Sequence, residues 1–522
     1  MRNWCLAIFI ATASFYMLTS SREPAWGDAH PMWEVADRLV EHGGVDIKTR
    51  WPEDIPTGRD GKVYGIAAIG DAIVHVPGAA ILSLTHRAAP SYDALVRPLA
   101  THLGPSLLGG LAAVLFFLLL VDLGIGKRTA SLCTAILAVA TTTWVYAHYP
   151  YSEIVQLTCF LGTFRATIRT AADPSKREAL WFGAWAGMLV NAKYVLALPV
   201  LGAAVLLGWT LRNRRGELKR VLGWACAGGA PFLALALGYN FWRWGSITAT
   251  GYGPYLDAYF GGSVGDGAWG MLLSPNKSAF LYSPPLVLAV LGLPAAIRAV
   301  PRFGWALVAM VVPTFVVYCT YRSWSGDYAW GPRFFVWIVP VLLVGLAWFV
   351  QAMSRARKAV LGAVVAAGIC VQILGVSLYW DHFIRIAIAT KNQWLGNPNR
   401  KGAYIADKGR GHCDSCFEDT YEILWTPAFQ PIRGHWWLLR SLAAGDSAAE
   451  AQASAPWRTY TSLDVNLDAD YPRARLDWWG MLWISDAVGT RVVGLACLFV
   501  FLAGTGFGVL RWLRYHRGTT DP

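Results

Sequence analysis

The sequence has few charged residues. Only 15% of its 522 residues are Asp, Glu, Lys or Arg, while 55% are hydrophobic; a typical globular protein has about 25% charged residues. Apolar runs of about 17 to 22 residues recur, and each is long enough to cross a hydrocarbon core of about 30 Å. This composition excludes an ordinary soluble protein and predicts an all-α polytopic membrane protein.

The sequence also lacks the glycine-rich loops that hold nucleotides. No stretch fits GxxxxGK[ST], and no GxGxxG lies between a predicted strand and a helix. This absence argues against direct use of a nucleotide sugar and against an ATP-driven pump. The formal charge of +12 does not indicate nucleic-acid binding, because Lys and Arg collect in short loops between apolar runs, where they set orientation.

Cysteine pairs outside the apolar runs are scarce. Of nine Cys, only Cys413 and Cys416 fall in a polar stretch, which reads HCDSC. A structural zinc site usually needs four ligands, and no second pair exists outside the membrane, so no metal site is predicted. In an oxidising compartment Cys413 and Cys416 are candidates for a local disulfide, with free thiols as the alternative.

The apolar runs predict roughly 12 transmembrane helices. The basic loops between them all fall on one side if the N-terminus lies there too, and the positive-inside rule makes that side cytoplasmic. Both termini are therefore expected in the cytoplasm and the long polar segments outside. After a first span near residues 4–18, the spans are expected near 100–121, 129–147, 152–170, 179–193, 195–211, 219–239, 283–300, 303–319, 333–352, 358–377 and 491–513.

This orientation divides the chain into three parts. Residues 1–377 form a transmembrane domain that includes a first outer loop over 21–100. Residues 378–490 form an extracytoplasmic loop region, expected to build a small cap, and 491–522 hold the last transmembrane helix and a cytoplasmic tail. The apolar stretch 66–85 contains Asp71, His75 and Pro77, so we expect it in the outer interface or as a re-entrant segment.

Several ionisable residues lie where spans meet the outer side, where they are costly and indicate function. The stretch WGDAHPMWEVAD, just after the first span, contributes acids, and a turn between two later spans contributes another. Cations that hold a phosphate and a carboxylate that takes a proton from a hydroxyl would suit a phosphorylated lipid substrate. The acids are Asp28, Glu34, Asp37 and Glu153, and the cations are Lys62, Lys193, Arg243 and Arg333.

Each of these residues also has a structural interpretation. Asp28 precedes a predicted helix and could cap it, and Glu34 and Asp37 fit a solvated helix face. An acid such as Glu153 suits a helix N-terminus. Lys193 could instead reach the outer interface from the end of its span, and Arg333 could anchor the start of its span.

Four stretches carry a resemblance to a known family. They are WGDAHPMWEVADRLVEHG after the first span, GKVYGIAAIGDAIVHVPGAAI, YNFWRWGSITATGYGPY with LLSPNKSAFLYSPPLVLAVLGL, and WSGDYAWGPRFFVWIVPVLLV. In this order they resemble the GT-C class of membrane glycosyltransferases, the polyprenyl-phosphate-sugar-dependent enzymes akin to protein mannosyltransferases and aminoarabinose transferases. The chain departs from that pattern at Ile66 and Ala67, where relatives often have Lys-Tyr; Lys62, Lys193 or Arg333 could supply the missing cation.

The resemblance implies a GT-C-like fold and an activity. It implies inverting transfer of a sugar from an undecaprenyl-phosphate or similar polyprenyl-phosphate donor to a hydroxyl of a glycan, lipid or protein, at the extracytoplasmic face of the cell (inner) membrane. Asp28 matches the family's catalytic acid and would act as general base. No cofactor is required, although a divalent metal is compatible with the sequence. The alternatives are a transporter or flippase for a lipid-linked glycan, and a non-catalytic relative in envelope assembly.

Overall fold

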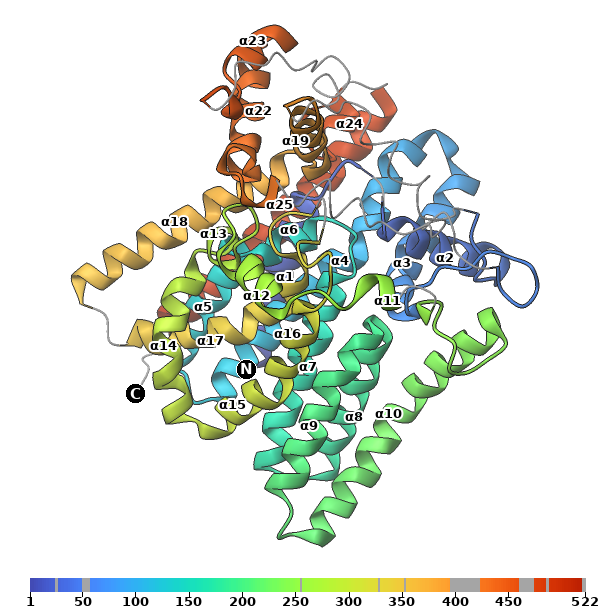
Figure 1. Ribbon diagram of the computed structural model, residues 1–522, viewed down its shortest axis with the longest axis vertical. Helices are drawn as coiled ribbons and strands as arrows, with labels where there is room; N and C mark the ends of the chain where they lie inside the picture. Colours follow the sequence, from blue (N-terminus) through green and yellow to red (C-terminus); the bar gives the residue numbers. More distant parts are fainter. Residues whose placement is uncertain are drawn as a thin grey trace.

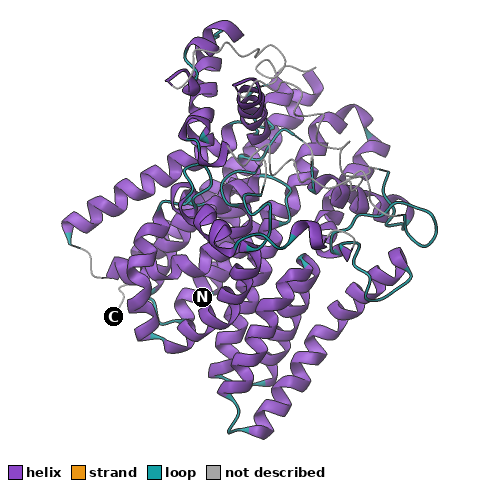
Figure 2. Ribbon diagram, viewed as in Figure 1, coloured by secondary structure: helices purple, strands orange, loops and turns teal. Residues whose placement is uncertain are grey.

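The computed structural model describes residues 1–23, 27–48, 57–253, 256–326, 329–351, 354–394, 423–459, 474–484 and 488–518. Within these ranges the regular structure is helical (Figure 2), and the extended pairings are four isolated β-bridges. The predicted all-α fold is confirmed. The Cys413–Cys416 stretch lies outside the described residues.

Each predicted span falls on one helix or on a short series of helices. Six segments are long and apolar enough to cross a membrane, or seven if the pair α5–α6, bent by 57°, is one span. The multi-pass prediction is confirmed, whereas the count of 12 stays a prediction. The helices that lie at the predicted spans are α1 (Arg2–Leu18), α4 (Asp93–Asp122), α5 (Lys127–Ala140) with α6 (Thr142–His148), α7 (Glu153–Ala172), α8 (Lys176–Ala192), α9 (Ala197–Thr210), α10 (Arg215–Trp244), α14 (Pro285–Ala299), α15 (Pro301–Ala306) with the π-helical turn η4 (Leu307–Val311) and α16 (Val312–Cys319), η5 (Arg333–Ile338) with α17 (Val339–Gln351), α18 (Arg355–Ser377) and α25 (Val488–Gly518).

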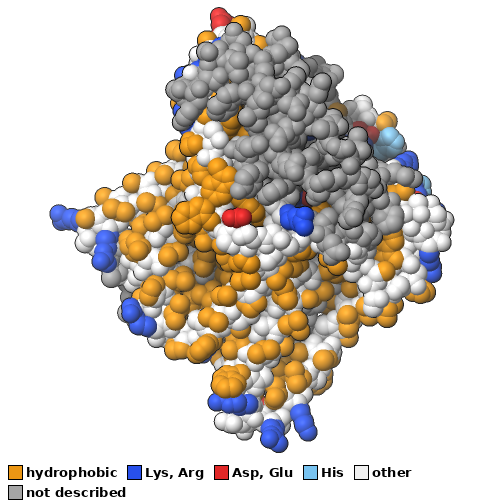
Figure 3. Space-filling view, viewed as in Figure 1, with side chains coloured by type: hydrophobic (Ala, Val, Ile, Leu, Met, Phe, Trp, Pro, Cys, Tyr) orange, Lys and Arg blue, Asp and Glu red, His pale blue; other side chains and the backbone are white. Residues whose placement is uncertain are grey.

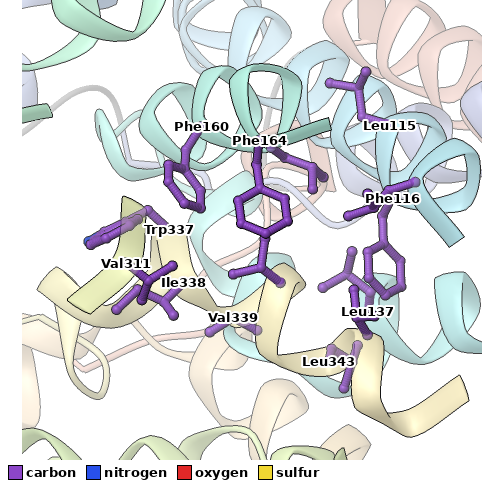
Figure 4. Close-up of a cluster of buried hydrophobic side chains, with 14 of the residues drawn as sticks. Leu115, Phe116, Leu137, Phe160, Phe164, Val311, Trp337, Ile338, Val339 and Leu343 are labelled. Carbon is purple, nitrogen blue, oxygen red and sulfur yellow. The ribbon is translucent and has the colours of Figure 1, made fainter. Parts of the chain in front are cut away.

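The largest hydrophobic core surrounds α7. Phe160 on α7 meets Trp337 of η5 edge to face at 4.6 Å between ring centroids, and aliphatic and aromatic side chains from α4, α5 and α17 fill the space beside them (Figure 4). Such aromatic pairs favour fixed relative orientations. Because Glu153 and Arg333 are the first residues of α7 and η5, this packing aligns the two helix starts.

Short helices gather at one end of the molecule, which we call the cap end. Figure 1 shows α19 (Trp380–Trp394), α22 (Pro431–Ala444) and α23 (Ala448–Ala453) there, and the loop from α9 to α10 at the opposite end. These helices bury a separate core that includes Phe383, Trp437, Leu438 and Trp457. The predicted boundaries of the three parts of the chain stay predictions.

The surface between the two ends is largely apolar. Figure 3 shows hydrophobic side chains over the flank of the bundle and Lys and Arg gathered at the end opposite the cap, near the turn from α9 to α10. Leu233 on α10 and Phe499 on α25 are among the large apolar side chains that are exposed. An apolar flank between polar ends is what a bilayer requires of a multi-pass protein.

The predicted first outer loop contains two helices, α2 (Ala29–His42) and α3 (Ile69–Ala88), which pack on each other, and α3 also packs on α4. The contact with α4 is close, because a Cβ added at Gly78 would lie 2.0 Å from the Ala100 carbonyl oxygen. Helix α3 is not among the segments long and apolar enough to span. Its buried face carries Asp71 and His75, two of the residues that interrupt the apolar stretch.

Candidate active site

Arg333 joins two carboxylates from distant parts of the chain. Its Nη1 donates to Asp28 Oδ2 at 2.7 Å, and its Nε donates to Glu153 Oε1 at 2.6 Å. The partners are separated from Arg333 by 305 and 180 residues, so only the folded chain brings the three together. Three residues that the sequence predicted separately therefore meet in one place.

Asp28 is held at the start of α2 with its carboxylate accessible. Gly27 before it has φ +56°, and a Cβ at that position would lie 3.3 Å from the Tyr151 hydroxyl; glycine provides both the left-handed conformation and the space. The Asp28 side chain makes no capping hydrogen bond to α2 and is 54% exposed. It bonds Arg333 rather than acting as a helix cap, so it remains reachable by a substrate.

Glu153 shows the opposite exposure. Its side chain is 3% exposed, and although Oε1 accepts from Arg333, Oε2 is buried and has no hydrogen-bond partner within the part of the chain that the structure describes. A buried carboxylate oxygen without a donor is costly. Glu153 lies at the start of α7, where the helix dipole favours an acid. This position gives Oε2 no hydrogen bond, so Oε2 can accept one from a ligand.

Lys193 follows α8 and lies against aromatic rings. Its Nζ is 4.7 Å from the centroid of Phe334 and 5.7 Å from that of Tyr318. Among the described residues no carboxylate lies within ion-pair distance of it, whereas Phe334 follows directly on Arg333. A cation over rings beside an arginine is positioned to accept an anion.

Asp71 adds a third carboxyl group, which the sequence indicated only as an interruption of an apolar stretch. It is 3% exposed, and its Oδ1 lies 3.9 Å from His75 Nε2. Burial raises the pKa of Asp71 to about 8, the charges of Glu153 and Asp28 raise it as well, and Arg333 opposes them. Asp71 is therefore protonated at neutral pH.

We call this set, Asp28, Asp71, Glu153, Lys193 and Arg333, the Arg333 cluster. With Asp71 neutral, the charges of two carboxylates and two cations balance. The cluster thus combines two cations that can attract a phosphate with carboxylates that can accept a proton. An ionisable group inside an otherwise apolar stretch was the signal in the sequence that could have identified Asp71 as a member.

Two predicted cations lie elsewhere. The buried Arg243 guanidinium donates to the carbonyl oxygens of Gly65 and Ala67 and to Asn240 Oδ1 at 2.8 Å. It therefore supports the segment around Ile66, where the chain departs from the family pattern. Lys62 is exposed, and its Nζ lies 4.0 Å from Asp46 and 3.9 Å from Asp60.

The other two acids that the sequence predicted as candidates, both on α2, have different surroundings. Glu34 accepts a hydrogen bond from the backbone N–H of Lys48 at 2.6 Å. Asp37 is half-buried, and burial, then Glu41, raises its pKa, whereas Arg97 lowers it. In the part of the chain that the structure describes, no group of three or more His, Cys, Asp or Glu side chains is arranged to hold a metal ion.

No protein-family model and no curated protein matches the chain. Solved structures do resemble it. ArnT from Cupriavidus metallidurans bound to undecaprenyl phosphate is 14% identical, with a TM-score of 0.49 over 97% of this chain and 77% of that one. The apo state of the same protein is 12% identical, with a TM-score of 0.48 over 96% of this chain and 76% of that one. The archaeal oligosaccharyltransferase AglB from Archaeoglobus fulgidus, in complex with an inhibitory peptide and a dolichol-phosphate, is 12% identical. Its TM-score is 0.43, over 72% of this chain and 55% of that one.

Both proteins are GT-C glycosyltransferases, the class that the sequence resembles. The likeness is one of helix arrangement. The roles of individual residues in this chain therefore follow from their own contacts.

Proposed function

We propose that this protein is a membrane glycosyltransferase that moves a sugar from a polyprenyl-phosphate donor to a hydroxyl acceptor, with inversion at the anomeric carbon. One observation carries the proposal: the Arg333 guanidinium bridges the exposed carboxylate of Asp28 and the buried carboxylate of Glu153. A phosphate-binding cation and a candidate base thus touch each other at the start of three helical elements.

Arg333 and Lys193 would bind the donor phosphate. Arg presents its N–H groups in a fork that matches phosphate oxygens, and Lys193 adds a second positive charge. Arg333 is neutralised by Asp28 and Glu153, so an incoming phosphate competes with these carboxylates. Binding of the donor would loosen Asp28 from Arg333, which makes its carboxylate a stronger base when the substrate is in place.

Asp28 would act as the general base. The acceptor oxygen attacks the anomeric carbon, its proton passes to the Asp28 carboxylate, and the bond from that carbon to the phosphate oxygen breaks. The lipid phosphate leaves with the bonding electrons, and Arg333 and Lys193 stabilise the negative charge that grows on it. Since attack and departure occur on opposite faces, the configuration inverts.

The proposal includes a location and partners. A lipid donor reaches the site laterally from the bilayer, so the Arg333 cluster would lie at the extracytoplasmic face of the cell membrane, with both termini in the cytoplasm. The acceptor is a hydroxyl of a glycan, a lipid or a protein. The divalent metal and the phosphate contacts of Lys62 and Arg243 are not needed for this chemistry.

The test uses purified protein in lipid, a panel of radiolabelled polyprenyl-phosphate sugars and a crude envelope acceptor. The wild type, Asp28→Asn and the control Asp93→Asn are compared, because Asp93 is an acid on α4 paired with His86 at 2.6 Å, outside the Arg333 cluster. We expect transfer by the wild type and the control, and a loss of about 10² to 10⁴ in rate for Asp28→Asn with donor binding retained.

Other outcomes reassign the function. Equal transfer by Asp28→Asn would reject Asp28 as the base and move catalysis to Glu153, Glu34 or Asp37. Movement of the donor across the bilayer without turnover would reject transfer in favour of a transporter. Absence of both turnover and donor binding would favour a non-catalytic relative.

A further inference from the structure

A second buried carboxylate, Asp477, binds two segments that lead into the candidate site. Asp477 lies before the last transmembrane helix and is 2% exposed. Its Oδ1 accepts from Ser21 Oγ at 2.6 Å and from the Arg22 backbone N–H at 3.1 Å. Its Oδ2 accepts from the Tyr149 hydroxyl at 2.6 Å and lies 3.6 Å from His148 Nε2.

The partners of Asp477 stand directly upstream of the candidate catalytic acids. Ser21 and Arg22 precede Asp28, and Tyr149 precedes Glu153, in the loops that connect each acid to the preceding membrane segment. One carboxylate therefore ties together two loops that are far apart in the sequence. The spacing between Asp28 and Glu153, which Arg333 spans, depends on how these two loops are held.

Asp477 is itself fixed on both sides. Its backbone N–H donates to the Ser377 carbonyl oxygen at 2.9 Å. The indole N–H groups of Trp478 and Trp479 both donate to the Leu18 carbonyl oxygen, at 2.8 and 3.1 Å. The segment around Asp477 is thus attached to the end of α1 and to the end of α18, so its carboxylate cannot shift without breaking these bonds.

The energetics favour a charged Asp477. Burial alone would raise the pKa of this carboxyl, but His148, Ser21 and Tyr149 more than compensate, and the pKa falls to about 2. Hydrogen bonds to an ionised acceptor are roughly twice as strong as neutral ones. Loss of the charge would weaken the attachment of both loops at once.

We infer that Asp477 is a positioning residue for the proposed reaction: by holding the Ser21–Arg22 and His148–Tyr149 segments together, it sets the placement of Asp28 and Glu153 around Arg333. This inference rests on the proposed function. Asp477 does not touch Asp28, Glu153 or Arg333 in the described contacts, and it acts through the two loops. A displacement of about 1 Å at a reacting group is enough to cost about 10² in rate.

The first test measures the loops directly. Hydrogen–deuterium exchange is compared for the wild type, Asp477→Asn and Asp122→Asn in lipid nanodiscs. Asp122 is a suitable control because it is a half-buried acid that binds Arg165 at 2.7 Å and Arg169 at 3.0 Å, away from Asp28 and Glu153. In Asp477→Asn we expect exchange about 10-fold faster in peptides over residues 18–23 and 146–152, and no such change in Asp122→Asn.

Tyr149→Phe provides a milder variant if Asp477→Asn folds poorly. It removes one donor to Asp477 and keeps the ring. Its control is Tyr146→Phe, because the Tyr146 hydroxyl donates to the Trp330 carbonyl oxygen at 3.0 Å and not to Asp477. Faster exchange of residues 18–23 in Tyr149→Phe but not in Tyr146→Phe supports the inference; unchanged exchange in both Asp477→Asn and Tyr149→Phe overturns it.

The second test separates positioning from general stability. With the donor that the wild type uses, Asp477→Asn should lower kcat by about 10² and change the donor KM less than twofold, because Arg333 and Lys193 remain. Asp122→Asn should alter neither constant. An unchanged kcat in Asp477→Asn, or a loss that Asp122→Asn reproduces, contradicts a positioning role.

The two tests also separate this inference from the proposed function. If the wild type transfers no sugar, the proposed function fails, whereas the exchange of residues 18–23 and 146–152 still decides whether Asp477 holds the two loops. If transfer occurs and the exchange of both segments stays at the wild-type rate in Asp477→Asn, the inference alone fails.

Discussion

Two clusters of charged residues lie at opposite ends of α7, and they differ in how completely they are paired. At the end of α7, Arg169 donates to Glu178 through Nε at 2.8 Å and Nη2 at 2.7 Å, and through Nη1 to Asp122 at 3.0 Å. We call these residues, with Arg165, the Arg169 cluster. At the start of α7, Arg333 also binds two acids, but one is exposed and the other has an unpartnered oxygen.

The difference indicates which end can bind a ligand. In the Arg169 cluster, Arg169 makes a two-point contact with Glu178 and a third bond to Asp122, which suits a role in joining α4, α7 and α8. In the Arg333 cluster, Glu153 Oε2 has no hydrogen-bond partner among the described residues and Lys193 Nζ lies over the Phe334 ring, whereas Asp122 Oδ2 lies 2.7 Å from Arg165 Nε. Both clusters join helices, and we propose that the Arg333 cluster is the one that binds an anion and exchanges a proton.

The largest expected effect comes from removing the central arginine. Arg333→Ala would leave the buried Glu153 carboxylate without its cation, so we expect the free energy of unfolding to fall by about 3 kcal/mol and transfer to be lost. Arg169→Ala should also destabilise the protein, but the remaining folded protein should transfer sugar normally. Denaturation in detergent and transfer per folded molecule check both statements.

A double variant sharpens this prediction. In Arg333→Ala with Glu153→Gln, the uncompensated charge is gone, so stability should recover while transfer stays absent. Recovery of transfer as well would show that Arg333 serves only to neutralise Glu153.

The second prediction concerns the buried acid. Glu153→Gln keeps an oxygen that can accept from Arg333 but removes the negative charge that competes with phosphate. We therefore expect undecaprenyl phosphate to bind several-fold more tightly, about 1 kcal/mol for a charge near the site, and transfer to slow. Glu178→Gln, in the Arg169 cluster, should leave both quantities unchanged. Weaker phosphate binding in Glu153→Gln would contradict the predicted competition.

The third prediction uses the lysines at the two ends of α8. Lys193 lies over Phe334, and Lys176 lies over Trp224 with 3.9 Å to the ring centroid. Lys193→Met should weaken undecaprenyl phosphate binding by about 10-fold, which corresponds to about 1.4 kcal/mol. Lys176→Met should not alter it. Equal affinities for the two variants would remove Lys193 from the phosphate site.

The final prediction is a pH dependence of stability that originates at Asp71. Asp71 loses its proton at about pH 8 in the folded protein, against 3.8 for the ordinary side chain. Its folded pKa is raised, so its contribution to stability is complete below pH 4 and declines as pH rises to about 8, by at most about 1.4 kcal/mol per pH unit. The stability of Asp71→Asn should lack this decline. The control Asp93→Asn should retain it, and identical pH profiles for wild type and Asp71→Asn would contradict the assignment.

The sequence predicts most of the helices because long apolar runs have few other solutions in a membrane. It also identifies Asp28, Glu153, Lys193 and Arg333 as separate candidates, since ionisable residues at span ends are uncommon. It does not show that these four meet, because the meeting depends on how α2, α7, α8 and η5 pack.

Local pattern likewise could not separate the remaining candidates. Arg243 resembles Arg333 in sequence context, yet its guanidinium is used by backbone carbonyls of the Gly65–Ala67 segment. Asp71 and Asp477 were missed as members of functional networks. The side chains that bind the Asp477 carboxylate lie more than 300 residues away along the chain, a distance at which neither periodicity nor spacing carries information.

The most direct test of the central claim is the affinity for undecaprenyl phosphate in nanodiscs, measured for the wild type, Arg333→Ala and Arg169→Ala at equal folded protein. We expect the wild type and Arg169→Ala to bind alike and Arg333→Ala to bind at least about 10-fold more weakly. Equal binding by Arg333→Ala and Arg169→Ala would contradict the assignment of the Arg333 cluster as the phosphate site.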